Sequence, residues 1–393
     1  MNSTPTPPND WVINHLGEDR ESYHHAVSPP VFLSSNFSYS TLEEMRFAIQ
    51  NESSEPFYTR GTNPTLTMLA EKIAALEGGE ACLLFASGSA AIAAAVCSQI
   101  SLGDHVICID KPYSWTAKLL QTWLARFGVF VTFVDGSLDA VKAAIRPQTK
   151  LLYLETPNSF TFELQDIAAL TSLVKPLGIK TIVDNSYCTP LFQQPVSLGA
   201  DMVVHSATKY FSGHSDALGG ILVCTAEDRE KIFKSEYMTL GGTMSPMNAW
   251  LILRGLRTLP VRLRQSHETG MQVAEWLYRN PKVELVRYPF HPADPQYDLA
   301  IRQMKGAGGL VSFSLKTEDP DQIERFCNSL RYFLLACSWG GYESLCFPAA
   351  SFVTSGNYKQ STVPHNMVRL YCGLEDAENL IADLEQAINK GLV

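Results

Sequence analysis

Between residues 81 and 224, short and almost uninterrupted apolar runs alternate with longer segments whose apolar residues recur every three or four positions. The short runs predict buried strands, and the longer segments predict the helices that cover them. We expect strands over 81–85, 105–109, 129–133, 151–155, 181–183, 202–204 and 220–224, and helices over 66–77, 87–99, 116–127, 138–145 and 166–177. Repeated strand–helix units predict an α/β domain with a mostly parallel sheet covered on both faces.

The pattern changes after residue 251. A long helical segment over 251–280 contains Gly255 and Pro260, which predict a break or kink. Shorter elements follow, with strands expected over 283–288, 310–315 and 367–370 and helices over 321–329 and 376–390. This arrangement predicts a smaller α+β domain.

The first 60 residues are rich in Pro, Ser and Asn and carry one expected helix, over 41–49, with Ser40 or Thr41 as its cap. They offer little apolar surface for a core of their own. We therefore expect an arm that packs on another surface, such as that of a neighbouring subunit. The expected division is an arm over 1–60, a large cofactor-binding domain over 61–255 and a small domain over 256–393.

Composition narrows the class of protein. The chain has 393 residues, 46% of them hydrophobic and 18% charged, with a net charge of −9, which disfavours nucleic acid or an anionic membrane as a partner. The nine cysteines are scattered without a Cys-x-x-Cys pair, and neither a signal peptide nor a membrane span is evident. We expect a soluble cytoplasmic protein with reduced thiols and no metal site.

Two polar residues at expected strand ends suggest the chemistry. Lys209 follows the strand 202–204, within Ser206-Ala207-Thr208-Lys209, and Asp184 follows the strand 181–183. Ligands of open α/β sheets bind beyond the carboxyl ends of strands. Enzymes that use pyridoxal phosphate place a lysine, which holds the cofactor covalently, and an acid, which faces its pyridine nitrogen, at such strand ends. The Ser-x-Thr-Lys motif alone is weak, because many lysines follow strands without such a role.

Three further turns could complete a cofactor site. The small residues Ser87-Gly88-Ser89 open a helix whose first amides could face a phosphate, although they would serve tight packing equally well. Tyr113 ends another strand and could stack on a ring or simply be half-buried. The turn containing Tyr58 and Arg60 could grip an anion or be an ordinary surface loop.

Together these motifs are specific. From about Asn14 onward the chain resembles the fold-type I pyridoxal phosphate enzymes of cysteine and methionine metabolism. The motifs are Tyr58-x-Arg60-x-x-Asn63-Pro64-Thr65, Ser87-Gly88-Ser89-Ala90-Ala91-Ile92, Asp184-Asn185 and Ser206-x-Thr208-Lys209. The resemblance implies an aspartate aminotransferase-like fold and homotetramers built from dimers that share each active site between two chains.

The resemblance also implies residue roles. Lys209 would hold the cofactor, Asp184 would pair with its ring nitrogen and Tyr113 would stack on its face. The phosphate would be held by Gly88, Ser89, Ser206 and Thr208, with Tyr58 and Arg60 from the neighbouring chain. Arg369 would bind the substrate α-carboxylate, and Ser338 and Trp339 would line the same pocket. Lys209 would move the α-proton, and Lys209 or Tyr113 would protonate the leaving thiolate.

Within the family the chain looks most like bacterial cystathionine β-lyases of transsulfuration and methionine biosynthesis. Ser159 and Trp339 stand where the γ-synthase and γ-lyase branches usually carry Asn and Leu, and the stretch 255–265 also resembles the β-lyases. Two departures are Ser89, for a usual Met, and Ser114-Trp115, where the γ-branches have Gly-Gly. The expected reaction turns L-cystathionine into homocysteine, pyruvate and ammonia.

Other functions stay open at this point. A cystathionine γ-synthase or γ-lyase, or a general cysteine or cysteine-conjugate β-lyase, would carry the same cofactor residues. A catalytically silent regulator that binds pyridoxal phosphate is a further alternative, since fold does not fix function. Trp339 could also merely pack beneath Tyr342 rather than face a substrate.

Overall fold

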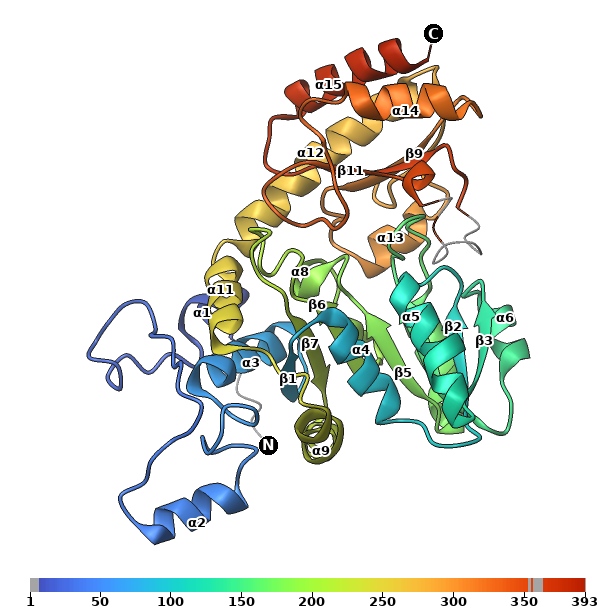
Figure 1. The fold of residues 1–393 in the computed structure, drawn as a ribbon. Coiled ribbons are helices and arrows are strands. Elements are labelled where there is room, and N and C mark those ends of the chain that lie inside the picture. Colours follow the sequence, from blue (N-terminus) through green and yellow to red (C-terminus); the bar gives the residue numbers. More distant parts are fainter. Residues whose placement is uncertain (1–6, 353–354, 356–362, 393) are drawn as a thin grey trace.

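A seven-stranded sheet forms the centre of the computed structural model, which describes residues 7–352, 355 and 363–392 (Figure 1). Its order is β1-β7-β6-β5-β4-β2-β3. β7 runs antiparallel to β1 and β6, and the other neighbouring pairs are parallel. The strands are β1 Ala81–Phe85, β2 His105–Ile109, β3 Phe130–Val134, β4 Thr149–Glu155, β5 Lys180–Asp184, β6 Met202–Ser206 and β7 Gly220–Cys224. The expected α/β class with a mostly parallel sheet is confirmed.

Helices cover both faces of this sheet because successive strand residues point to opposite sides. On β6, Val203 packs in one apolar cluster with α3, whereas Val204 packs in a second cluster with α4. In the described ranges, none of the helices combines the length and apolar character needed to cross a bilayer. The helices of this part are α3 Pro64–Glu77, α4 Gly88–Cys97, α5 Ser114–Lys118, α6 Leu138–Ala144, α7 Ile167–Val174, α8 Thr189–Phe192, α9 Ala226–Ile232, α10 Met238–Leu240 and α11 Pro246–Leu256.

A second sheet of five strands, in the order β10-β11-β12-β9-β8, lies on the side of the carboxyl ends of the parallel strands (Figure 1). Its strands are β8 Val283–Arg287, β9 Leu310–Leu315, β10 Leu334–Leu335, β11 Leu345–Pro348 and β12 Met367–Tyr371. Its helices are α12 Leu259–Arg279, α13 Tyr297–Gln303, α14 Pro320–Ser329 and α15 Ala377–Gly391. The smaller α+β unit is thus present, while the boundaries at residues 60 and 255 stay a prediction.

The long helical segment breaks where Gly255 and Pro260 predicted. α11 ends at Leu256, and Pro260 stands in the first turn of α12. A proline is tolerated there because first-turn amides have no partner within the helix. The joint lies close to the turn after Lys209, since a Cβ on Gly255 would be 2.1 Å from the Ser212 carbonyl oxygen. The connection between the two sheets therefore packs directly against the chain that carries Lys209.

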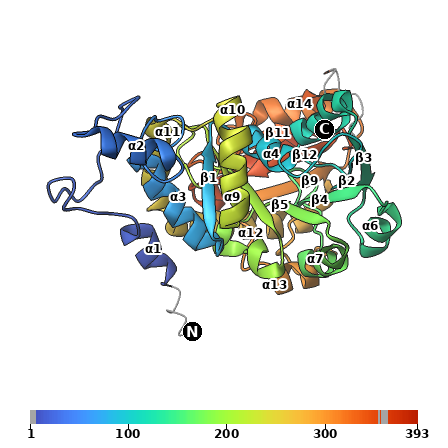
Figure 2. The ribbon, with the colours of Figure 1, turned by 90° about the horizontal axis from the view of Figure 1, so that it is seen from below.

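The N-terminal arm projects away from the sheets in both views (Figures 1 and 2). Its helix α2, Leu42–Gln50, begins as expected at Thr41, whose side chain and that of Glu44 form a reciprocal capping box. Leu33 is 66% exposed and Phe47 58% exposed, so the arm leaves apolar side chains uncovered in a single chain. Residues 1–6, on which the expectation about a signal peptide partly rests, lie outside the described residues.

Some elements differ from expectation. The segment 116–127 is not one helix but α5, a π-helical turn η1 Leu119–Trp123 and a 3-10 turn η2 Leu124–Phe127. Gly128 ends it with φ +72°, a conformation that glycine adopts without steric cost. The α-helices that were not predicted are α1 Asn9–His15, α8, α9, α10 and α13, and the strands are β10 and β11. Each is short, and the apolar period is least informative over such lengths.

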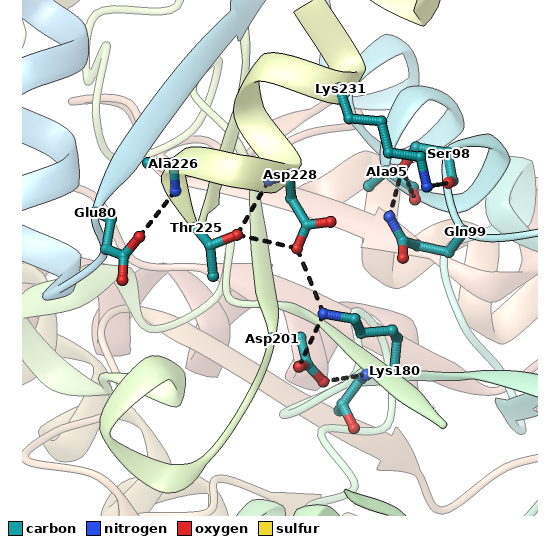
Figure 3. A network of polar contacts seen from close by, with 11 residues as sticks. Glu80, Ala95, Ser98, Gln99, Lys180, Asp201, Thr225, Ala226, Asp228 and Lys231 are labelled. Carbon is teal, nitrogen blue, oxygen red and sulfur yellow. Dashed lines mark hydrogen bonds and ion pairs between the residues drawn. The ribbon is translucent and has the colours of Figure 1, made fainter. Parts of the chain in front are cut away.

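A polar network fixes the edge of the large sheet that lies opposite the ends of β5 and β6 (Figure 3). The Lys180 Nζ lies 3.4 Å from the Asp201 carboxylate and 3.5 Å from that of Asp228. At the start of β1, the Glu80 carboxylate accepts the main-chain N–H of Ala226 at 2.9 Å. These partly exposed contacts join the starts of β1, β5 and β6 to the first turn of α9. The ends of β5 and β6 lie at the opposite edge of the sheet.

Candidate active site

The expected site residues meet at the carboxyl edge of the parallel strands. Glu155, the last residue of β4, stands directly beside Asp184, the last residue of β5. Ser206 ends β6, and a Cβ on Gly88 at the start of α4 would lie 3.0 Å from the Ser206 Cβ. Parallel strands deliver their ends to one edge, so residues far apart in sequence converge here.

Lys209 lies at the centre of this group. Its Nζ donates a hydrogen bond to the Ser338 Oγ at 2.6 Å and lies 5.5 Å from the centre of the Trp339 ring. Burial, and next the positive charge of Arg369, lower the pKa of the Lys209 amine to about 8. A lysine with such a pKa is partly neutral near neutral pH, as a nucleophile or base must be.

Asp184 is a buried carboxyl with several donors. The Ser186 main-chain N–H donates to its Oδ1 at 2.9 Å, and the Tyr153 hydroxyl lies 3.5 Å from its Oδ2. Burial raises the pKa of Asp184 despite these bonds. An apolar surrounding penalises an isolated carboxylate, so a cation brought next to Asp184 would be strongly attracted.

The start of α4 forms a close-fitting turn. The Ser87 side chain caps the helix by accepting the Ala90 N–H, and the space beside Gly88 is closed by Ser206. The Thr208 Oγ1 accepts the Gly219 N–H at 3.2 Å, and Ser89 is exposed. A ten-residue helix whose N-terminus lies beside the Ser206 side chain fits a phosphate. These residues thus fit the expected pyridoxal phosphate.

Arg369 on β12 reaches the same region from the second sheet. Its Nη1 donates to the Ser159 carbonyl oxygen at 2.7 Å and its Nη2 to the Ser338 carbonyl oxygen at 3.3 Å. Ser338 has φ +75°, which a serine rarely adopts and which often marks a functional site. The arginine, Ser338 and Ser159 are thereby brought together, as a substrate pocket requires.

Trp339 is 6% exposed and packs on two tyrosines. Its ring centre lies 5.3 Å from that of Tyr210 and 6.5 Å from that of Tyr187. Tyr342, the alternative packing partner, is 57% exposed. The indole therefore sits between the core and the Lys209 amine.

Tyr113 follows β2 and is 39% exposed, so its ring borders the open side of the site. Its main-chain N–H donates to the Glu155 Oε2 at 2.6 Å. Burial, and next the nearby Asp184, raise the pKa of the Glu155 carboxyl to about 8. Glu155 was not among the expected site residues. Its only signal in the sequence is an acid at the end of an apolar run, which does not distinguish it from a solvated strand end.

Tyr58 and Arg60 are not brought to Lys209 of the same chain. The Arg60 guanidinium lies 5.5 Å from the centre of the Tyr58 ring, and both residues are exposed on the arm. Within the described residues, neither side chain makes a hydrogen bond or ion pair with Lys209, Asp184 or Ser206. The expectation that both residues reach the site of a neighbouring chain stays a prediction.

Comparisons with known proteins agree with this geometry. The sequence profile of the family described as Cys/Met metabolism PLP-dependent enzyme matches residues 11–389. The chain is 41% identical over 382 residues to an L-methionine gamma-lyase of Pseudomonas deceptionensis, with 95% of each chain covered. It is 38% identical over 376 residues to a cystathionine gamma-synthase of Mycobacterium tuberculosis, again with 95% of each covered. The crystal structure of metB from Corynebacterium glutamicum matches with a TM-score of 0.91 and 34% identity, covering 98% of both chains.

Proposed function

Because the chain belongs to the family of pyridoxal-phosphate-dependent enzymes of cysteine and methionine metabolism, we propose that it breaks or forms the bond between the γ-carbon and the sulfur of a sulfur amino acid. The observation that carries the proposal is 41% identity over 95% of both chains to an L-methionine gamma-lyase. A cystathionine gamma-synthase at 38% identity supports the same class. The β-lyase reaction expected from local motifs therefore becomes the second candidate.

In this proposal the carboxyl edge of the large sheet holds the cofactor. Lys209 would hold it covalently through Nζ, Asp184 would pair with its pyridine nitrogen and Tyr113 would stack on its ring. Gly88 and Ser89 at the start of α4 would hold the phosphate together with Ser206 and Thr208. The bound cofactor supplies an electron sink for the bonds of the substrate α-carbon.

Arg369 is the proposed receptor for the substrate carboxylate. A guanidinium binds a carboxylate through two parallel N–H bonds, which a lysine cannot reproduce. Its bonds to the Ser159 and Ser338 carbonyl oxygens, at 2.7 and 3.3 Å, orient it before a substrate enters. Such preorganisation lowers the entropy lost on binding.

Lys209 is the proposed proton carrier. Its amine, with a pKa lowered to about 8, can take up the α-proton of the substrate once it is neutral. γ-Chemistry needs a second proton to leave the β-carbon, so the same amine or another base must reach that atom. The departing thiolate needs a proton in turn, and the Tyr113 hydroxyl and the Lys209 ammonium are the proposed donors.

A β-lyase is favoured by one observation, the position of Trp339. Its buried ring lies 5.5 Å from the Lys209 Nζ, which leaves less room beside the amine than a leucine would. A restricted side chain favours direct expulsion of a β-thiolate over a further proton transfer at the β-carbon. The expected products from L-cystathionine are then homocysteine, pyruvate and ammonia.

Product analysis distinguishes these reactions. With L-cystathionine, γ-cleavage gives cysteine, 2-oxobutyrate and ammonia, and with L-methionine it gives methanethiol, 2-oxobutyrate and ammonia. We expect 2-oxobutyrate as the dominant oxo acid, or cystathionine from an O-activated homoserine and cysteine. Pyruvate as the dominant product would establish the β-lyase instead. Trp339→Leu should raise the share of 2-oxobutyrate if the indole limits γ-chemistry.

The assembly is also proposed rather than observed. The uncovered apolar side chains of the arm support a dimer in which each arm completes the partner's site, and a homotetramer of two such dimers. Within the described residues Arg60 makes no hydrogen bond or ion pair with Lys209, Asp184 or Ser206, which also supports it. We also propose that the chain divides into an arm and two domains at residues 60 and 255, and that the protein is cytoplasmic.

A further inference from the structure

The Glu155 carboxyl receives donors from two different loops. It accepts the Tyr113 main-chain N–H at 2.6 Å, and it also accepts the hydroxyl and the main-chain N–H of Ser159. Glu155 is only 4% exposed, so these donors replace water around its oxygens. A buried carboxyl with several donors is held in one position, and it holds the groups that donate to it.

These two loops lead to two different proposed functional groups of the site. Tyr113 follows β2, and its side chain is 39% exposed. Ser159 follows β4, and its carbonyl oxygen accepts the Arg369 Nη1 at 2.7 Å. One carboxyl at a strand end thus connects the tyrosine to the arginine through main-chain groups, which keep their geometry better than exposed side chains.

We propose that Glu155 is a positioning residue of the active site, which fixes the Tyr113 ring on one side and, through Ser159, the Arg369 guanidinium on the other. The proposal rests on the proposed function for the roles of Tyr113 toward the cofactor and Arg369 toward the substrate. It adds a residue that need not touch either molecule. Its effect should appear both in cofactor geometry and in substrate affinity.

The charge environment gives this contact a pH dependence. Asp184 from β5 faces Glu155 directly, and Cys108 from β2 and Tyr153 from β4 lie close to Glu155. Two further groups interact electrostatically with Asp184, namely His205 on β6 and Lys209 in the turn after it. Burial and Asp184 raise the pKa of Glu155 to about 8. Below that pH a proton occupies one oxygen and competes with the donors, and above it the carboxylate accepts all of them.

The first test compares Glu155→Gln and Glu155→Asp with wild type. An amide has the shape of the acid, but its NH₂ cannot accept an N–H, whereas aspartate keeps the carboxylate on a shorter stem. Glu163→Gln is the matched control, because Glu163 is a more exposed carboxylate that pairs with Lys111 at 2.7 Å. Each protein is stripped of cofactor and titrated with pyridoxal phosphate, and the circular dichroism band of the bound cofactor is recorded from pH 6.5 to 9.5.

We expect Glu155→Gln to weaken cofactor binding and to raise KM, each by a factor on the order of ten, because the substitution removes a charged hydrogen bond. The change in kcat should be smaller. The dichroism band of this variant should change in size, and the pH dependence of that band should differ from that of wild type. Glu155→Asp should recover part of each property, and Glu163→Gln should match wild type. A Glu155→Gln protein whose cofactor affinity, dichroism and KM all lie within twofold of wild type would overturn the inference.

A second variant keeps the test valid if Glu155→Gln does not fold. Ser159→Ala removes one donor from a half-buried residue and leaves the main chain in place, so KM should rise while cofactor affinity changes little. An unchanged KM would contradict the link to Arg369. Cofactor affinity and dichroism do not depend on which sulfur amino acid is cleaved. A protein that gives no 2-oxobutyrate but shows these Glu155 effects would refute the proposed function and leave this inference standing.

Discussion

The Lys209 Nζ and the Ser338 Oγ lie 2.6 Å apart, although the two residues belong to opposite sheets. Lys209 follows the last parallel strand of the large sheet, and Ser338 precedes β11 of the second sheet in a main-chain conformation with φ +75°. The amine is therefore held across the joint between the two parts. Any movement between the sheets would change the position and the protonation of Lys209 together.

The first prediction separates the Ser338 hydroxyl from its backbone. Ser338→Ala removes the hydroxyl that accepts the Lys209 hydrogen bond but leaves a strained φ. Ser338→Gly removes the hydroxyl and also relieves the strain, because glycine adopts a positive φ without steric cost. Because the hydroxyl stabilises the ammonium, either change should lower the Lys209 pKa below about 8, by roughly one unit. The measurement is the pH dependence of Lys209 acylation in cofactor-free protein. An unchanged profile in both variants would show that the hydrogen bond does not tune the amine.

The second prediction concerns the arm. Arg60→Ala and Lys209→Ala chains should each be almost inactive alone, because the first would lose the proposed phosphate contact and the second the amine proposed to hold the cofactor. Refolding them together should restore activity, since a mixed dimer contains one site with both residues intact. If the two chains are mixed equally and half of the dimers are mixed, each mixed dimer has one intact site of two. The expected activity is then about a quarter of the wild-type activity per chain. No recovery, with mixed dimers shown by mass, would mean that sites are not shared.

The third prediction concerns the turn before α4. A Cβ on Gly220 would lie 2.0 Å from the Ser87 carbonyl oxygen, so the start of β7 and the cap of α4 can approach only with glycine there. Gly220→Ala should cost about 1–3 kcal/mol of stability or more and weaken cofactor binding, because main chain must move. Gly242→Ala is the control, since its nearest neighbour would be the Ala90 Cβ at 3.5 Å. Urea unfolding and cofactor titration would measure both effects, and equal behaviour of the two variants would contradict the clash.

The fourth prediction concerns acid stability. His105 is buried at the start of β2, with Nδ1 2.8 Å from the Thr149 hydroxyl and Nε2 2.9 Å from that of Thr132. Burial, and next Arg146, lower its pKa in the folded chain. The unfolded chain therefore binds more protons once the pH falls below about 6.5, and folding stability decreases with it. His105→Gln should flatten the fall in urea midpoint between pH 7.5 and 5.5, and the exposed His15→Gln should not.

The sequence predicted the large sheet well because its strands are short apolar runs bounded by helical segments. The same pattern placed Lys209 and Asp184 at one edge, since parallel strands must end together. It did not reveal Glu155, whose importance depends on donors from loops that meet only in the fold. It also did not identify β11, which is four residues long and gains its register from β12.

The choice between β- and γ-chemistry shows a different limit. Ser159 and Trp339 favoured a β-lyase, yet relatives named for γ-reactions match along almost the whole chain. Trp339 changes the room beside Lys209, and Ser159 contacts Arg369, while the residues proposed to hold the cofactor stay the same. Reaction preference depends on how that room admits a proton transfer at the β-carbon, and residue identity alone does not determine it.

The arm is fastened to α3 at two points. The buried Lys72 ammonium donates to the Val12 and Ile13 carbonyl oxygens, each at 3.1 Å, and pairs with Glu18 at the same distance. Farther along the arm, the side chain of Asn63, the N-cap of α3, donates to the Phe32 carbonyl oxygen at 2.9 Å. The stretch 33–62 is thus a closed loop rather than a free tail, and doubling its length would cost only about 0.6 kcal/mol in closure entropy. The length of this loop, and with it the distance that it can span toward a neighbouring chain, can therefore vary with little loss of folding free energy. The two attachment points of the arm cannot move without disrupting α3, the helix that precedes the sheet.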